Sequence, residues 1–206
     1  MKTILIVLGV LAVLAIGIVG AGISSYNGLV ARQQGVEASW AQVQNVYQRR
    51  ADLIPNLVST VSGAANFEKS TLMAVTEARA SVGRVTIDAS KAPTDAAQLV
   101  EFEKAQGQLS SALSRLLVVS ERYPDLKATA GFRDLQAQLE GTENRISVER
   151  GRFNEMVQSY NYAIKKIPEV FFAAALGFKE RPYFMAAPTA QTPPQVKFDF
   201  NQTDKK

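Results

Sequence analysis

The chain has 206 residues, of which 47% are apolar and 20% are charged, and its formal net charge is +4 at neutral pH. This composition excludes a disordered chain and a uniformly membranous one, and it leaves room for one domain of ordinary size. Basic residues are spread along the chain with acidic residues between them, and no basic patch is interleaved with aromatic residues. We therefore expect no binding of nucleic acid.

The sequence contains no His and no Cys. This absence excludes His-dependent catalytic triads, Cys nucleophiles, disulfides and the usual zinc ligand sets. It also excludes di-iron carboxylate bundles, which need Glu-x-x-His pairs. We expect no catalytic, cofactor-binding or metal-binding residues, no cofactor and no enzymatic activity.

The first predicted element is a transmembrane anchor within residues 1–23. Residues 4–23 read ILIVLGVLAVLAIGIVGAGI and carry no charge, and a helix of this length matches a hydrocarbon core of roughly 30 Å. A cleaved signal peptide is the alternative, but its apolar region is usually about 7–15 residues long. Lys2 precedes the run and Arg32 is the nearest charge after it. The positive-inside rule then places the N-terminus in the cytoplasm and the remaining chain outside.

The stretch over residues 36–61 is the centre of the predicted fold. Its apolar residues recur every three or four positions, which is typical of one buried helix face. This stripe consists of Val36, Trp40, Val43, Tyr47, Ile54, Leu57 and Val61. Pro55 lies inside the pattern, where it removes a backbone donor and predicts a bend near Ala51. Residues 69–82 either continue this helix or form a second one.

Two further long helices follow a predicted loop over residues 83–93. The first opens at Thr94–Asp95 and ends before Pro124, and its stripe consists of Leu99, Phe102, Leu109, Leu113 and Leu116. Residues 125–131 are expected to form a turn. The last long helix carries the stripe Phe132, Leu135, Leu139, Thr142, Ile146, Glu149, Phe153, Met156 and Tyr160. The near-heptad period predicts antiparallel packing at about 20°, so the fold class is an all-α antiparallel bundle over residues 24–185.

Two charged residues lie on these apolar stripes, Arg50 on the first and Glu149 on the last. A buried charge without a partner costs several kcal/mol, so each requires an opposite charge. We predict that Arg50 or Arg49 pairs with Glu149 or Glu143 across the bundle. The alternative is that these long side chains extend to the edge of the stripe and reach water.

The first long helix also carries polar side chains beside its stripe: Gln44, Asn45, Gln48, Arg49, Asp52 and Asn56. We favour hydrogen bonds between helices as their role, with a contact surface for another protein as the alternative. A hydrolase that pairs Asp52 with Glu143 or Glu140 is a third possibility. We disfavour it because acidic residues at helical spacing are most often solvated or ion-paired.

The C-terminal region is predicted to hold a short helix and an extended tail. The helix starts at Ile167-Pro168-Glu169 and stops at Gly177, and its apolar side chains are expected to cover one end of the bundle. Contact with a membrane or a partner is the alternative. In the Pro-rich tail over residues 186–206, Val196, Phe198 and Phe200 alternate with polar residues. This pattern suits a strand that pairs with another subunit or a partner, or a disordered segment.

Several motifs between about residues 24 and 185 resemble the LemA family. These are SYNGLV (25–30), WAQVQNVYQRRADLIPNLV (40–58), EKSTL (68–72), EARA (77–80), RYPDLK (122–127) and LEGTENRI (139–146). The chain departs from the family pattern at Phe67, where His is common, and at Phe153, where Tyr is common.

The resemblance implies an N-terminal anchor in the bacterial inner membrane and a four-helix up-and-down bundle. It implies no established activity. The family includes a magnetosome membrane protein, and its members often occur beside membrane metalloproteases or small phosphatase-like membrane proteins, which suggests a membrane protein partner. Our leading hypothesis is a single-pass, non-catalytic scaffold that contacts the bilayer and forms homo-oligomers. A membrane-shaping protein is the alternative.

Overall fold

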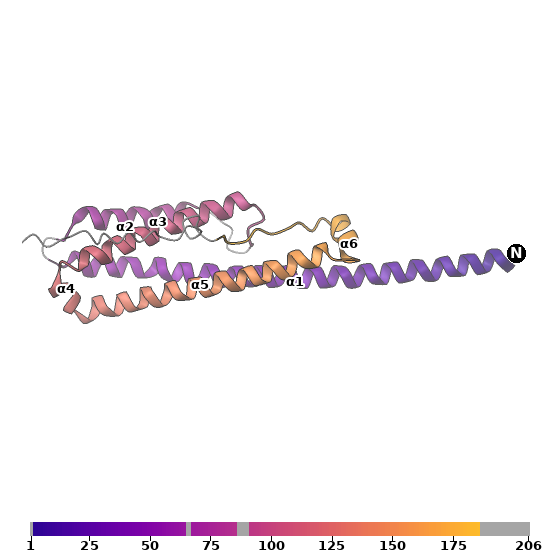
Figure 1. Cartoon of the computed structure of the whole chain (residues 1–206), viewed down its shortest axis with the longest axis horizontal. Coiled ribbons are helices and arrows are strands. Elements are labelled where there is room, and N and C mark those ends of the chain that lie inside the picture. Colours follow the sequence, from indigo (N-terminus) through magenta and orange to yellow (C-terminus); the bar gives the residue numbers. More distant parts are fainter. Residues whose placement is uncertain (1, 65–66, 86–90, 186–206) are drawn as a thin grey trace, which may run out of the picture.

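The structure is a computed structural model that describes residues 2–64, 67–85 and 91–185. Its described residues form six helices and no strand: α1 (Lys2–Ser62), α2 (Lys69–Arg84), α3 (Ala96–Ser120), α4 (Pro124–Ala128), α5 (Ala130–Lys165) and α6 (Glu169–Leu176). Figure 1 shows a rod in which α1 runs along the whole length and α5 lies antiparallel beside it. The paired helices α2 and α3 cover the half of the rod away from the N-terminus (Figure 1). The predicted all-α antiparallel bundle is confirmed.

Helix α1 continues through Pro55 without an interruption. Proline has no backbone N–H, so the carbonyl four residues earlier, that of Ala51, lacks its usual partner. The Nε of Arg79, on α2, donates a hydrogen bond of 3.1 Å to the Ala51 oxygen. A side chain from the neighbouring helix thus replaces the missing intrahelical bond, so the long helix tolerates a proline here.

Side chains at the helix ends account for the element boundaries. The Asp95 carboxylate accepts the Ala97 N–H at 2.8 Å at the start of α3, and Thr129 Oγ1 accepts the Phe132 N–H at 3.4 Å at the start of α5. Gly177 ends α6 in the left-handed region at a φ of 77°, a conformation that glycine adopts without strain. The second helix predicted from residue 69 onward is separate from α1. Of the later helices, α3 and α5 begin with a side-chain cap.

The turn predicted over residues 125–131 is wrong. Residues 124–128 form the short helix α4, because Pro124 fixes a helical φ at the first position and Asp125 favours the first turn. Helix α5 begins directly afterwards, at Ala130.

The apolar stripes of α1 and α3 are buried as predicted, whereas the stripe of α5 changes near its end. On α5 the buried residue after Phe153 is Val157, and Met156 is 40% exposed. An α-helix has 3.6 residues per turn, so its buried face drifts away from a strict heptad over several turns. The prediction for Met156 is corrected accordingly.

The buried residues form two hydrophobic clusters along the rod. One contains Trp40, Tyr47, Phe102 and Ile146. The other lies nearer the tip opposite the N-terminus and contains Ile54, Leu109 and Leu139. On each of α1, α3 and α5 the nearest members of the two clusters are about two helical turns apart, and a buried polar group occupies this gap. This group is the first part of the candidate site described below.

The N-terminal part of α1 lies outside the bundle core. All buried residues of α1 fall between Leu29 and Val61, and the apolar stretch before them is exposed. This stretch is long and apolar enough to cross a membrane, and none of it is buried inside the protein. The division of the chain at residues 23 and 185 stays a prediction.

Helix α6 covers the end of the core less completely than predicted. Ala173 is buried in the core and Phe172 is partly buried, but Phe171 and Leu176 are exposed. A helix of about two turns presents only one face to the bundle, so its other apolar side chains point outward. The tail residues Val196, Phe198 and Phe200 lie outside the described residues, and their strand stays a prediction.

Candidate functional site

A polar layer separates the two hydrophobic clusters, and Arg50 is its centre. The side chain is 1% exposed. Its Nη1 donates to Ser110 Oγ at 2.8 Å and forms an ion pair with Glu143, and its Nη2 donates to Gln106 Oε1. The guanidinium also lies 5.1 Å from the centre of the Tyr47 ring. Arg50 therefore joins α1 to α3 and α5, which confirms the predicted pairing of Arg50 with Glu143.

The other two charges named in that prediction lie elsewhere. Glu149 is partly buried and pairs with Arg152 of the same helix at 2.8 Å. Arg49 is exposed, because it lies one position away from the buried stripe and a helix turns by about 100° per residue. Of the four charged residues named in the prediction, Arg50 and Glu143 are the two that pair across the bundle.

Trp40 is an aromatic centre of the core. Its ring is fully buried and lies 5.6 Å from Phe102 and 5.5 Å from Phe153, measured between ring centres. Phe184, from the segment after α6, stacks on it at 6.0 Å. Trp40 therefore acts as a packing residue here, and no surface is available on it for a partner.

The segment after α6 is held along α5 by two asparagines. The amide of Asn161 donates to the Arg181 carbonyl and accepts the Arg181 N–H, both at 2.9 Å. Asn154 makes the same pair of bonds to Phe184, at 3.0 and 2.9 Å. The two asparagines are seven residues apart and so share a helix face. This double clamp was not foreseen, and the seven-residue spacing of two asparagines is the sequence signal that points to it.

A second charged group lies beside this clamp and is centred on Glu37. One carboxylate oxygen of Glu37 accepts a bond of 3.0 Å from Arg181, and the other accepts the Ala92 N–H. Arg181 also donates to the Ala92 carbonyl at 2.8 Å. The nearby Tyr160 phenol has a raised pKa because it is buried, although Arg181 partly offsets this effect. These bonds fix the segment before α3 and the segment after α6 to α1.

The polar side chains of α1 form an exposed stripe. Asn45, Arg49, Asp52 and Asn56 recur at steps of four, three and four residues, and all four are exposed. Among the described residues, the one side-chain hydrogen bond of this group joins Gln48 to Asp52 at 2.7 Å within the same helix. Within the described part of the chain, these four side chains form no hydrogen bond to another helix, because they lie on the face opposite the buried stripe. Gln44, by contrast, is partly buried and lines a groove with Arg79 and Gln106. The stripe is available to another molecule.

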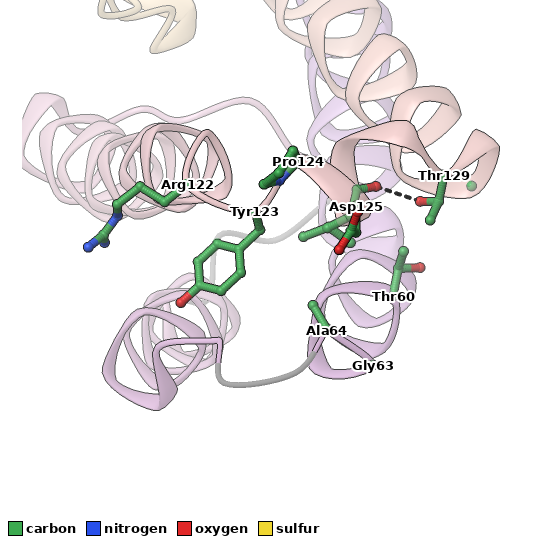
Figure 2. Close-up of a pocket in the computed structure, with 10 residues that line it drawn as sticks. Thr60, Gly63, Ala64, Arg122, Tyr123, Pro124, Asp125 and Thr129 are labelled. Carbon is green, nitrogen blue, oxygen red and sulfur yellow. Dashed lines mark hydrogen bonds between the residues drawn. The ribbon is translucent and has the colours of Figure 1, made fainter.

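A pocket of about 610 Å³ opens at the tip of the rod opposite the N-terminus. Figure 2 shows Tyr123 and Pro124 on one side and Asp125 and Thr60 on the other, with Ala64, which follows the end of α1, between them. The Tyr123 ring also packs against Phe67 at 4.8 Å. Residues 122–127 carry one of the family motifs, and this motif falls outside the long apolar stripes. A family motif outside the apolar stripes is the sequence signal that could have identified the tip as a candidate site.

No catalytic arrangement is assembled from the candidate carboxylates. Asp52 is bonded to Gln48, Glu143 to Arg50, and Glu140 to Gln136 at 3.0 Å. Among the residues that the structure describes, no group of three or more acidic side chains is placed to hold a metal ion.

Over the residues that the structure describes, the fold and these sites define an all-α bundle protein with one candidate membrane span. The model of the LemA family matches residues 39–198, and the chain belongs to this family. Family membership and the apolar N-terminal helix fit a membrane-associated helical protein.

Curated relatives resemble most of the chain at low identity. Magnetosome protein MamQ of Magnetospirillum gryphiswaldense is 26% identical over 193 residues, which cover 83% of this chain and 70% of the relative. Magnetosome protein MamQ 2 of Paramagnetospirillum magneticum is 26% identical over 208 residues, or 92% and 74% of the two chains. Protein LemA of Metamycoplasma hominis is 24% identical over 138 residues, or 67% and 58%.

Proposed function

We propose that this protein is a single-pass, non-catalytic scaffold or self-assembling interaction module at the bacterial inner membrane. The observation that carries the proposal is helix α1, which joins an apolar stretch outside the core to the central stripe of the bundle. A helix with this division suits an anchor that holds a rigid domain at the membrane. The charges of Lys2 and Arg32 favour a cytoplasmic N-terminus and a bundle on the outside.

The exposed polar stripe of α1 is the proposed contact surface. Asn45, Arg49, Asp52 and Asn56 point away from the core, and their side chains keep donors and acceptors for a partner. A second copy of the chain or another membrane protein would use this stripe. The exposure of the stripe along a rigid helix supports the proposal, since little order must be gained on binding.

The test is the mass of the full-length protein in detergent beside that of residues 24–206, both measured by light scattering. The shorter chain keeps every buried residue of α1, since these begin at Leu29. We expect a uniform assembly in both chains, with the same number of copies. Monomers in both would contradict self-assembly and direct the search to a foreign partner by crosslinking.

A charge reversal tests the contact surface. Arg49→Glu combined with Asp52→Lys exchanges two exposed charges on the stripe and should shift the full-length assembly toward monomers. Glu101→Lys combined with Lys104→Glu is the matched control, because these residues have the same three-residue spacing on an exposed face of α3. Equal effects of the two reversals would show that the α1 stripe has no special role.

A further inference from the structure

An apolar surface on α6 remains uncovered by the bundle. It consists of Ile167, Phe171 and Leu176, which are all largely exposed. We call this group the α6 patch. Apart from Glu169 at its first position, α6 contains only apolar residues. A soluble surface seldom gathers large apolar side chains in so short a segment, and such patches commonly mark a contact with a membrane or another protein.

The α6 patch lies at the level where the apolar part of α1 ends. The Phe172 ring packs against Gly22, and a Cβ atom at Gly22 would lie 3.2 Å from this ring. One helical turn further along α1, Tyr26 packs on Phe178 with ring centres 6.0 Å apart. Figure 1 shows α6 beside α1 at the end of the bundle, with the apolar part of α1 continuing beyond it.

The charged residues around α6 are of the kind found at the depth of the lipid headgroups. Lys166 pairs with Glu169 at 2.8 Å, and Lys165 pairs with Glu180 at 2.7 Å. Lysines at such a position keep their charge among lipid headgroups while apolar neighbours enter the acyl region. Tyrosine and other aromatic side chains are also enriched at this depth. Tyr26 and the phenylalanines of α6 provide them here.

We propose that the α6 patch inserts into the interfacial region of the same bilayer that α1 crosses. The protein then contacts the membrane at two places, through its span and through α6. The lipid surface is the occupant because α6, which carries the patch, packs through Phe172 against Gly22 at the end of the uncharged run of α1. This inference rests on the proposed anchor, so its test must separate the failure of one from the failure of the other.

The absence of native cysteines allows one fluorophore to be placed at a time on the full-length protein. Phe171→Cys and Leu176→Cys report on the patch, and Ile16→Cys reports on the span. Val118→Cys on α3 is the matched control, since Val118 is 70% exposed, Phe171 69% and Ile16 73%. Each variant is labelled with an environment-sensitive nitrobenzoxadiazole probe and reconstituted into phosphatidylcholine vesicles. Circular dichroism confirms that the helix content is unchanged.

Lipids that carry a spin label near the headgroup or deep in the acyl chain then quench the probes by depth. We expect a roughly twofold loss of fluorescence at positions 171 and 176 from the shallow quencher, because interfacial helices lie only about 5–10 Å deep. The probe at position 16 should respond to the deep quencher, and the probe at position 118 to neither.

Other outcomes would overturn the inference in distinguishable ways. Quenching at position 16 alone would retain the anchor and refute the contact of α6 with lipid. A blue-shifted but unquenched probe at position 171 would show that protein, such as a second copy, covers the patch. No quenching at position 16 would refute the anchor and the inference together.

Discussion

At the scale of single residues, Arg50 occupies a place where an apolar side chain would be expected. Its partners Ser110 and Gln106 come from α3 and its partner Glu143 from α5. A buried ion pair is seldom a net source of stability, because taking charges out of water costs about as much as their attraction returns. We infer that the polar layer instead fixes the register of the three helices, since a shift by one turn would leave the guanidinium without partners.

Removal of the Arg50 charge alone should be costly. Arg50→Met keeps the volume but leaves Gln106 and Ser110 without their buried donor, so we expect a loss of about 3 kcal/mol in the free energy of unfolding. Glu143→Gln should cost about 1 kcal/mol or less, because the Glu143 side chain is 44% exposed and water can replace part of the bond. Urea unfolding of the full-length protein in detergent, followed by circular dichroism, measures both. Equal losses in the two variants would contradict a special role for the guanidinium.

The raised pKa values of two tyrosines predict that the protein loses stability at alkaline pH. Burial raises the pKa of Tyr47, against the opposing effect of Arg150 and Arg50, and burial also raises the pKa of Tyr160. The native state then holds these protons more tightly than the unfolded state does. Their contribution is fully present below the ordinary tyrosine pKa of 10.0, and it declines as the pH rises through the raised native values.

The Tyr47→Phe and Tyr160→Phe double variant should lose less stability than the native protein between pH 10 and pH 11, a window set by that ordinary pKa. Thermal melting across this range measures the difference. Tyr162→Phe is the control, because Tyr162 is exposed. Parallel pH profiles for the native and double-variant proteins would count against this account.

At the scale of elements, the periodic spacing of apolar residues was the most reliable sequence signal for which residues are buried. The stripes through Trp40 and Leu109 were predicted because each buried residue repeats a signal every three or four positions. The Arg50 pairing followed from the same pattern, as a charge on a stripe. The contacts of Arg181 and Phe184 were not predicted, since the segment that carries these two residues has no period of its own and the signal lies in the spacing of two asparagines on α5. The short helix α4 was missed because five residues carry too little pattern.

The asparagine clamp predicts how the C-terminal segment responds to protease. Asn161→Ala leaves the N–H and the carbonyl of Arg181 without their partners, and each unpaired buried group costs roughly 1–3 kcal/mol. The segment should therefore open more often, and tryptic cleavage after Lys179 should accelerate about tenfold or more. Asn144→Ala, at an exposed position of the same helix, should leave the rate unchanged. A shared increase would indicate general loosening of α5.

At the scale of the whole molecule, the length of the rod fixes the distance between its tip and the proposed anchor. At 1.5 Å per residue, residues 24–62 of α1 extend the tip about 60 Å beyond the proposed anchor, whose end at residue 23 is a prediction. The pocket beside Tyr123 lies at this far end, and the α6 patch lies at the near end. A partner that binds the tip and one that binds near the membrane therefore meet surfaces well separated from each other.

The proposed orientation is open to a direct chemical test. Val118→Cys should react with a membrane-impermeant maleimide in intact spheroplasts, because Val118 is exposed and α3 lies beyond the membrane in the proposed topology. Lys2→Cys should react only after the membrane is permeabilised. The reverse pattern would place the bundle in the cytoplasm.

Because α1 is one unbroken helix, the rotation of the bundle about the helix axis is coupled to the rotation of the proposed span. Each residue of a helix advances by about 100°, so the direction in which the stripe through Arg49 faces is set by the number of residues that separate it from the anchor. In a protein anchored in this way, the bundle cannot rotate independently of the proposed span, as it could on a flexible linker. Proteins in the same bilayer would therefore contact the stripe from one side of the bundle only. A single residue inserted near Gly28 would rotate the stripe by about 100° and turn it away from them.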